Sequence, residues 1–176
     1  MTIRKATLDD YDAIWNIFKT VIQTGDTYPF SPNTKKESLT KNWFADYMNA
    51  YVMDQNGQII ATYMLKPNQV DLGSHIANCS YMVHPDARGK GAGKLICEHS
   101  ITEAKQLGYR AMQFNLVVST NHAAVNLWQK CGFEIIGTIP EGFKHQSLGY
   151  VDAYIMYRKL SDRSEERRVG KECTVR

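Results

Sequence analysis

The sequence predicts an α/β (α+β) fold in which a mixed central sheet of about seven strands carries helices on both faces. Three observations support this class. Short apolar or alternating runs, typical of strands, recur between longer stretches with apolar residues at i, i+3, i+4 and i+7, typical of amphipathic helices. Glycine, proline and asparagine separate these runs. The resulting order is β-α-α-β-β-β-α-β-α-β-β, and no internal repeat interrupts it.

The first half is expected to contain four strands and two helices. Thr7 is placed to cap the first helix, because threonine accepts a hydrogen bond from an opening helical turn. Asn56-Gly57 lies between two strand-like runs and indicates a hairpin turn. A loop containing glycine and proline, residues 24–33, connects the two helices. The expected strands are 2–6, 50–54, 58–65 and 75–83, and the second helix is expected at about 34–46.

The second half alternates strand and helix and then ends in two strands. The helix after the glycine-rich loop is expected to end at Gly108, because glycine is the preferred residue just past a helix, and Gly132 closes the next helix in the same way. The two apolar stripes are Ile96, Cys97, Ile101, Ala104 and Leu107, then Ala124, Leu127, Trp128 and Cys131. The expected strands are 111–119, 133–143 and 149–160, and the last helix is expected at 121–131.

Composition indicates one ordinary globular domain. The chain has 176 residues, of which 43% are hydrophobic and 22% charged. We expect this domain at residues 1–160. The stretch SDRSEERRVGKECTVR has almost no apolar residues, so 161–176 is expected to be a disordered or non-native tail outside the fold.

Charge, hydropathy and cysteine spacing argue against several classes of function. A net charge of +3, with acids and bases interleaved, argues against a nucleic-acid partner. No apolar run approaches the ~18 residues of a membrane span, and the start MTIRKATLDD does not read as a signal peptide. The four cysteines show neither metal-ligand nor disulfide spacing, and His75 and His145 are isolated, so we expect no metal. These features favour a cytoplasmic protein with reduced, buried thiols.

The stretch VHPDARGKGAGKL, residues 83–95, carries the strongest chemical signal. Glycines and cations between a strand and a helix are typical of an anion-binding loop. A Walker A loop is excluded, because Arg88 stands at the first glycine position and Leu95 follows Lys94. A dinucleotide fingerprint is excluded by the spacing of the glycines. The pattern R-x-x-G-x-G fits Arg88 to Gly93, and a plain surface turn remains the alternative.

With a second motif, NHAAVNLWQKCGFEIIG, this loop resembles the GNAT superfamily of acyl-CoA-dependent N-acetyltransferases over residues 2–160. The resemblance implies a GNAT fold, acetyl-CoA as co-substrate and a loop that holds its pyrophosphate. Val83 would offer main-chain groups to the pantetheine and help to polarise the acetyl carbonyl. Asn121 would bond the pantetheine, although it is also placed as a plain N-cap, and Asn126 either faces the cofactor or is solvated. The loop residues are Arg88, Gly89, Lys90, Gly91, Ala92, Gly93 and Lys94.

The implied reaction is direct attack of a free amine on the thioester, in a ternary complex. Many members have a tyrosine near the sulfur as general acid, and here Trp128 stands at that position. An indole N–H does not donate a proton at neutral pH, so we expect Trp128 to be a packing aromatic. His84 is placed either to relay a proton or to cap the strand end, and Tyr28, Glu141 and Tyr150 lie in segments that border the acceptor cleft in this superfamily.

Three asparagines also match the yeast L-azetidine-2-carboxylate N-acetyltransferases, with the same spacing: Asn78, Asn115 and Asn121. The loop TGDTYPFSP, which contains Tyr28, resembles the substrate-side loop of that group and of the phosphinothricin-type acetyltransferases. The resemblance implies that Asn78 and Asn115 hold a substrate carboxylate or orient the reacting groups, with Asn115, Asn121 and Val83 as the catalytic set. The alternative is that the strand asparagines bond to neighbouring backbone.

These matches predict an N-acetyltransferase that acts on a small-molecule amine, such as an amino acid or a proline analogue. The alternatives are a protein acetyltransferase acting on a lysine or an N-terminus, and a non-catalytic acyl-CoA-binding domain. A homodimer is compatible with the resemblance.

Overall fold

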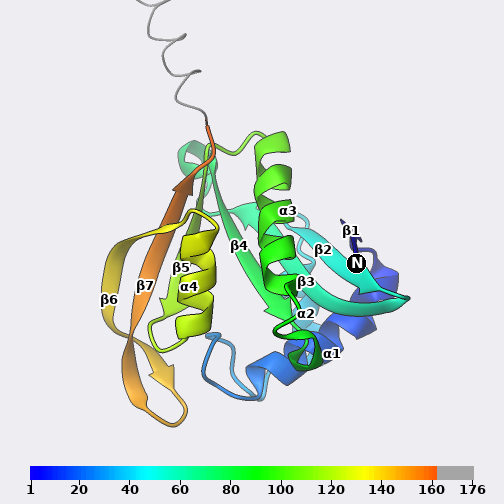
Figure 1. Cartoon of the computed structure of the whole chain (residues 1–176), viewed down its shortest axis with the longest axis horizontal. Coiled ribbons are helices and arrows are strands. Elements are labelled where there is room, and N and C mark those ends of the chain that lie inside the picture. Colours follow the sequence, from blue (N-terminus) through cyan, green and yellow to red (C-terminus); the bar gives the residue numbers. More distant parts are fainter. Residues whose placement is uncertain (162–176) are drawn as a thin grey trace, which may run out of the picture.

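The computed structural model describes residues 1–161 and contains one seven-stranded sheet (Figure 1). Its strands are β1 (Thr2–Lys5), β2 (Asn49–Gln55), β3 (Gln58–Pro67), β4 (Ile76–Val83), β5 (Ala111–Val118), β6 (Glu134–His145) and β7 (Gly149–Lys159). The helices are α1 (Tyr11–Ile22), α2 (Leu39–Trp43), α3 (Ala92–Gln106) and α4 (His122–Lys130), with short 3-10 turns η1 (Leu8–Asp10), η2 (Lys36–Ser38), η3 (Asp71–Gly73) and η4 (Pro85–Ala87). The predicted order of helices and strands is confirmed. Apart from Ser161, the predicted tail lies outside the described residues.

The sheet opens like a fork between β4 and β5. The strand order is β1-β2-β3-β4-β5-β7-β6, and every neighbouring pair is antiparallel except β4–β5. That parallel ladder pairs only Ile76–Asn78 with Ala111–Gln113. Beyond it, β4 and β5 diverge towards the start of α4 (Figure 1). The divergence leaves room for a ligand in the middle of the sheet.

Helices cover both faces of the sheet, as the sequence predicts. On one face, α3 and α4 pack on a core that includes Tyr81, Ile96 and Phe133. On the other face, α1 and α2 pack on a second core that includes Phe18 and Trp43. Because successive strand residues point to opposite faces, β3 and β4 contribute to both cores in alternation. The mixed α/β class is therefore confirmed.

The chain enters the first helix through a polar clamp. Thr7 precedes η1, not α1 itself, and its backbone amide donates to the Asp10 carboxylate at 2.9 Å. The Arg4 guanidinium of β1 donates to both oxygens of the same carboxylate, at 2.8 and 2.9 Å. These hydrogen bonds hold the pKa of Asp10 below its usual range, and the Arg4 hydrogen bond is the largest cause. The clamp ties β1 to the start of α1.

Two helical predictions need correction. The helix expected at about 34–46 is a 3-10 turn followed by the short α2, because Ser38 Oγ donates to the Lys35 carbonyl (2.6 Å) and Tyr11 Oη to the Lys36 carbonyl (2.7 Å). Leu107 leaves the apolar stripe of α3 and is 49% exposed, because the helix ends there, and Tyr109 packs on the core instead.

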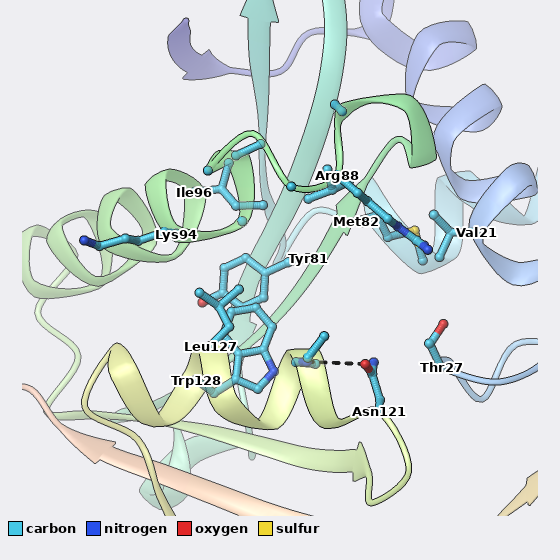
Figure 2. A pocket seen from close by; sticks show the side chains of 18 of the residues that line it. Val21, Thr27, Tyr81, Met82, Arg88, Lys94, Ile96, Asn121, Leu127 and Trp128 are labelled. Atoms are coloured by element: carbon cyan, nitrogen blue, oxygen red, sulfur yellow. Dashed lines mark hydrogen bonds between the residues drawn. The ribbon is translucent and has the colours of Figure 1, made fainter.

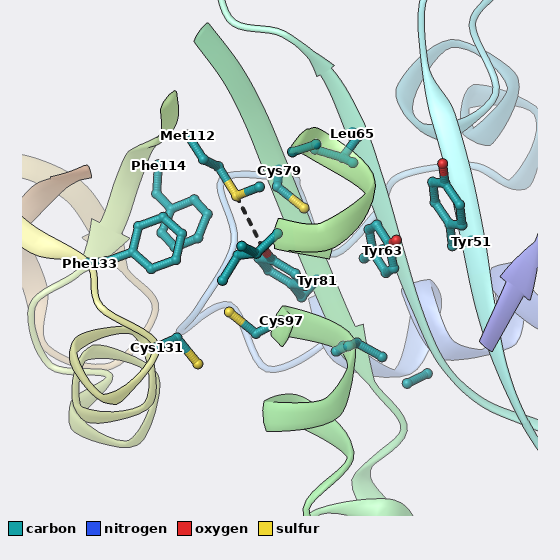
Figure 3. Packing of buried hydrophobic residues seen from close by; sticks show 14 of the residues in the cluster. Tyr51, Tyr63, Leu65, Cys79, Tyr81, Cys97, Met112, Phe114, Cys131 and Phe133 are labelled. Atoms are coloured by element: carbon teal, nitrogen blue, oxygen red, sulfur yellow. Dashed lines mark hydrogen bonds between the residues drawn. The ribbon is translucent and has the colours of Figure 1, made fainter. Parts of the chain in front are cut away.

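The predicted helix ends are confirmed. Gly108 and Gly132 follow α3 and α4 with φ of 85° and 88°, a left-handed conformation that favours glycine. Cys79, Cys97 and Cys131 are free and buried, as expected, and Figure 3 shows them among the aromatic side chains of the core. Cys173 lies outside the described residues.

Candidate active site

The fork exposes main-chain groups of β4. His84 donates its amide to the Ile60 carbonyl on β3 at 2.8 Å, so the main-chain groups of His84 face β3. Because these groups alternate between the two sides of a strand, those of Val83 and Tyr81 point away from β3, into the opening. No β5 partner reaches them, since the β4–β5 ladder has ended. The end of β4 therefore offers hydrogen-bonding groups to a ligand that enters the fork.

The glycines after β4 meet two different needs. Gly89 and Gly91 have φ of 75° and 81°, a conformation in which other residues are strained. Gly93 lies where α3 approaches α4, and a Cβ there would come within 2.9 Å of Leu127 Cδ2. The tight turn presents the first amides of α3, which have no acceptor within the helix. These amides and the helix dipole together favour an anion at this point.

The cations of the loop differ in what they contact. Arg88 reaches from the loop towards Val21 of α1 (Figure 2). Lys94 lies 3.7 Å from the Glu98 carboxylate, one turn further along α3. Lys90 is exposed and does not line a cavity. Backbone amides, a helix N-terminus and these cations form a cradle whose chemistry fits a pyrophosphate.

A cavity of about 390 Å³, the loop cavity, lies beside this cradle. Its walls come from the end of β4, the glycine loop, the start of α3 and one side of α4. Leu127 and Trp128 project from α4 towards Tyr81 (Figure 2). The Trp128 ring lies 4.7 Å from that of Tyr81 and 5.2 Å from that of Phe114, measured between centroids. Trp128 is therefore a packing aromatic, as expected.

A second cavity of about 240 Å³, the strand cavity, opens on the other side of the fork. Asn78, Cys79, Ser80 and Tyr81 of β4 all line it, and Asn78 and Ser80 share their face of the strand with Met82, which packs in the core under α1 and α2. The strand cavity therefore lies on the face of the sheet that carries α1 and α2. Lys66 of β3 and Asn115 of β5 complete its polar lining, together with residues of the 24–33 loop.

The two cavities meet at a shared wall. The residues that line both are Thr27, Tyr28, Tyr81, Asn121, Ala124 and Trp128. The Tyr81 hydroxyl lies 2.7 Å from Ser100 Oγ and also contacts Met112 Sδ, so it points into the core and away from both cavities (Figure 3). The phenol of Tyr28 is thus the tyrosine hydroxyl available at the junction.

The Tyr28 hydroxyl lies in a mixed electrostatic environment. Burial raises its pKa well above the usual range, and the neighbouring Cys79 acts in the same direction. The Arg88 charge and the Tyr81 backbone oppose the rise. Tyr28 therefore stays protonated at neutral pH, and its hydroxyl can donate a hydrogen bond.

The strand asparagines are already engaged with the protein. Asn78 Nδ2 donates to the Gln113 carbonyl at 3.0 Å, where the β4–β5 ladder ends. Asn115 Oδ1 accepts from Gln113 Nε2 at 3.0 Å, and its Nδ2 donates to Asn68 Oδ1 at 2.6 Å. Both side chains line the strand cavity, but each one participates in a network that joins the strands. These contacts agree with the alternative stated above, in which the strand asparagines bond to neighbouring groups of the protein.

Asn121 lies at the junction and also caps a helix. Its Oδ1 accepts the Ala124 amide at 3.3 Å, which fixes the start of α4 (Figure 2). Its Nδ2 has no acceptor among residues 1–161 and remains available to a ligand. Asn126 was expected to face the cofactor or the solvent, and its side chain is exposed and lines no cavity. Asn126 therefore faces the solvent and is not part of the candidate site.

The remaining candidates lie outside the junction. His84 Nδ1 accepts the Asp86 amide at 3.2 Å, which is the capping role rather than the relay. Glu141 and Tyr150 are exposed on the β6–β7 hairpin and line none of the cavities. Neither one is placed to act as a base on a molecule in the strand cavity.

A third cavity of about 470 Å³ lies between the 24–33 loop and the β6–β7 hairpin. The Gln146 amide donates to the Gly25 carbonyl at 3.1 Å and fastens the loop to the hairpin. Gly25 has a φ of 62°, and a Cβ there would collide with the Gln146 side chain. This contact holds Tyr28 and Pro29 over the fork, where the strand cavity begins.

Within 1–161, no group of three or more His, Cys, Asp or Glu side chains is arranged to hold a metal ion. In that part of the chain, no helix combines the length and the apolar character needed to cross a membrane.

Sequence comparison agrees with this geometry. Residues 12–133 match the sequence profile of the acetyltransferase (GNAT) family. The chain belongs to this family. The predicted GNAT resemblance is thus confirmed, and so is the assignment to a class of acetyltransferases.

Curated relatives carry related names. The chain is 33% identical to N-acetyltransferase aca1 of Schizosaccharomyces pombe over 104 residues, which is 58% of this GNAT chain and 50% of aca1. It is 32% identical to the L-amino acid N-acyltransferase MnaT of Escherichia coli over 97 residues, 54% of this chain and 55% of MnaT. These alignments span about half the length of each relative.

Solved structures share the fold over nearly the whole described chain. A GCN5-related N-acetyltransferase from Kribbella flavida is 37% identical, with a TM-score of 0.85 over 90% of this chain and 96% of the other. The putative acetyltransferase yncA from Salmonella typhimurium, solved with acetyl-CoA, is 23% identical, with a TM-score of 0.82 over 92% and 95%. The second likeness concerns the fold alone.

The polar lining residues of the strand cavity that the sequence did not single out are Thr27, Lys66 and Ser80. Thr27 precedes Tyr28 in the loop 24–33, so the predicted role of Tyr28 was a signal that Thr27 also lies near the acceptor site. Lys66 ends the strand-like run QIIATYMLK, and a cation at a strand end is common. The register of Lys66 with Asn78, which only the sheet reveals, is what brings it to the cavity.

Proposed function

We propose that this protein transfers the acetyl group of acetyl-CoA to the amine of a small molecule, namely an amino acid or a close analogue. The observation that carries the proposal is the junction of two cavities across the open fork. One cavity adjoins an anion cradle, the other is lined in part by polar side chains of β3, β4 and β5, and six shared residues separate them. A donor and an acceptor that enter from opposite sides meet at this wall.

The glycine loop is the proposed site of the CoA pyrophosphate. The amides that open α3 supply donors without side-chain rearrangement, and Arg88 and Lys94 add positive charge. Lys90 is exposed beside the same turn and contributes long-range attraction. Gly89, Gly91, Ala92 and Gly93 shape the loop so that its backbone reaches the anion. When bound, acetyl-CoA supplies an acetyl thioester to the fork.

Main-chain and amide groups of the fork orient the thioester. The main-chain groups of Val83 face the opening and are free of β5, so they suit the pantetheine arm and the acetyl carbonyl. Asn121 Nδ2 points from the start of α4 and adds a further donor. Because these groups are fixed by the sheet and by a helix cap, little reorganisation accompanies binding.

The acceptor amine attacks the thioester carbon from the strand cavity. A C–N bond forms, the C–S bond breaks, one proton leaves the nitrogen and one proton reaches the departing thiolate. Tyr28 stands at the junction with a protonated hydroxyl and orients the acceptor. Asn115 and Asn78 line the cavity where the acceptor lies, and their hydrogen-bonded network keeps its polar wall rigid.

Release of free CoA thiol tests this function. The purified chain is incubated with acetyl-CoA and a panel that contains L-azetidine-2-carboxylate, 4-hydroxyproline, phosphinothricin, a lysine-containing peptide and a peptide with a free N-terminus. Thiol release with an amino-acid acceptor, and none with the peptides, is the expected result. Release with a peptide alone favours the protein acetyltransferase, and acetyl-CoA binding without any release favours a non-catalytic domain.

A further inference from the structure

We propose that Lys66 is the anion-binding residue of the acceptor site, so that the preferred acceptor is an amine with a carboxylate or a similar oxyanion close to it. This inference rests on the proposed function, because it assigns the substrate class of the same site.

Lys66 belongs to the strand cavity by its register in the sheet. It pairs with Asn78 across the β3–β4 ladder, so the two side chains lie on the same face. Met64, two residues earlier, packs in the core under α1 and α2, which places Lys66 on that face too. Lys66 is half-buried and lines the strand cavity.

The charge of Lys66 is unmatched within the site. The other residues that line the strand cavity are uncharged. Among residues 1–161, no carboxylate forms an ion pair with Lys66. A cation at the edge of a cavity, without a counter-ion in the protein, keeps its charge and its three N–H donors free for a negatively charged ligand.

The neighbouring amides are weaker candidates for the anion. Asn78 has one N–H engaged with the Gln113 carbonyl, and Asn115 has one engaged with Asn68. Their carbonyl oxygens would repel a carboxylate. Lys66 carries three N–H donors and a full charge, and charge-assisted hydrogen bonds are roughly twice as strong as neutral ones. The expected carboxylate-holding role of Asn78 and Asn115 therefore moves to Lys66, with the asparagines as its supporting wall.

The size of the cavity limits the acceptor. Its volume is about 240 Å³, and Lys66 lines it without belonging to the junction, which Tyr28, Asn121 and Trp128 share with the loop cavity. A molecule of amino-acid size places its amine at the junction and its carboxylate at Lys66. A lysine side chain or the N-terminus of a protein has no carboxylate beside its reacting amine, so this arrangement disfavours both.

The experiment compares two acceptors that differ only in the anion, L-azetidine-2-carboxylate and its carboxamide. kcat/KM is measured by CoA thiol release for the wild type, Lys66→Gln, Lys66→Arg and the control Lys105→Gln, whose lysine is exposed on α3 and lines no cavity. Loss of one charge-assisted bond lowers kcat/KM for the carboxylate by about 10- to 100-fold in Lys66→Gln. The carboxamide value stays within about twofold, because that acceptor never used the charge.

Several outcomes would overturn the assignment. An equal loss for both acceptors in Lys66→Gln means a structural role, and no loss for either means that the lysine is a bystander. Lys66→Arg keeps the charge and is expected to retain the preference for the carboxylate, and Lys105→Gln is expected to match the wild type for both acceptors.

A binding measurement separates this inference from the proposed function. If the wild type releases no thiol with either acceptor, the function fails for this ligand, and titration calorimetry of the CoA-loaded protein with L-azetidine-2-carboxylate still tests Lys66. Binding by the wild type that weakens at least tenfold in Lys66→Gln supports the anion site. No binding by the wild type, or equal binding by both, contradicts it.

Discussion

Asn121 combines a structural and a ligand-facing role in one side chain. Its Oδ1 accepts the Ala124 amide and caps α4, while its Nδ2 faces the junction of the loop and strand cavities. Lys66 differs from Asn121, because its charge has no ion-pair partner among residues 1–161 and is left entirely for a ligand. At this scale the site is a set of groups whose hydrogen-bonding capacity is partly used by the fold and partly left for ligands.

Substituting Asn121 separates its two roles. Asp is as good an N-cap as Asn but lacks the amide donor. Asn121→Asp is therefore expected to have the same midpoint of urea unfolding as the wild type, and a kcat/KM that is lower by about tenfold or more. Asn121→Ala is expected to lose the same activity and, in addition, about 1 kcal/mol of stability. Urea titration and CoA thiol release measure the two effects. Full activity in Asn121→Asp would show that the Asn121 amide does not bind the substrate or the cofactor.

At the scale of elements, the glycine loop and α3 act as one unit. Gly91 ends the loop with a φ of 81°, and Gly108 follows the other end of α3 with a φ of 85°. A Cβ at either position would meet no other atom within 4 Å. The cost of a substitution there is therefore backbone strain and not a steric clash. They form a matched pair, because Gly91 borders the loop cavity and Gly108 does not.

Gly91→Ala and Gly108→Ala are expected to lose similar stability, about 1 kcal/mol each, from the left-handed backbone. Strain at Gly91 displaces the amides that open α3, so this variant is also expected to bind acetyl-CoA several-fold more weakly. Urea titration and calorimetry with acetyl-CoA provide the comparison. Equal acetyl-CoA affinity in the two variants would place the pyrophosphate elsewhere.

The elements that the sequence predicts well are those with a local signal. Strands with alternating residues and helices closed by Gly108 and Gly132 are found where they are expected. The segment 34–46 is expected to be one helix, but the side chains of Tyr11 and Ser38 bond the Lys36 and Lys35 carbonyls, which a longer helix needs. Tyr11 lies on α1, so this outcome depends on a tertiary contact that the local sequence does not contain.

At the scale of the whole molecule, one core packs on each face of the sheet, and a polar clamp ties the edge strand β1 to the start of α1. The Arg4–Asp10 clamp fixes β1 against the start of α1 and lies far from the fork in sequence. Asp10 is 6% exposed, so its charge depends on this partner. The clamp therefore contributes to stability without contacting the cavities.

Stability is expected to depend on pH through Asp10. Its folded-state pKa is lowered, so the stabilisation is present above the unfolded pKa of ~3.9 and is lost as the pH falls through the folded pKa. Asp10→Asn is expected to cost about 1.5 kcal/mol at neutral pH, and this difference from the wild type narrows in acid.

Urea titrations at neutral and acidic pH measure the Asp10 effect, with Asp12→Asn as the control. The Asp12 side chain is 83% exposed and pairs with Lys36 at the surface, so its loss is expected to cost at most about 0.5 kcal/mol. A constant difference between wild type and Asp10→Asn at all pH values would show that the carboxylate charge is irrelevant.

The site was predictable from the sequence to different degrees. The glycine loop is a contiguous motif with a fixed spacing, and it lies at the start of α3 beside a cavity. The acceptor side is assembled from β3, β4, β5 and the 24–33 loop, so no local pattern describes it. Asn78 and Asn115 were found because an amide in mid-strand is unusual, whereas Lys66 needed the register of the sheet.

The most direct test of the account is mass spectrometry of the products formed from acetyl-CoA and L-azetidine-2-carboxylate. The wild type is expected to form the N-acetylated amino acid in equal amount to the CoA thiol released, and Lys66→Gln is expected to form at least about tenfold less product at subsaturating acceptor. Thiol release without the N-acetyl product, or an acetylated peptide in preference to every amino acid of the panel, would contradict it.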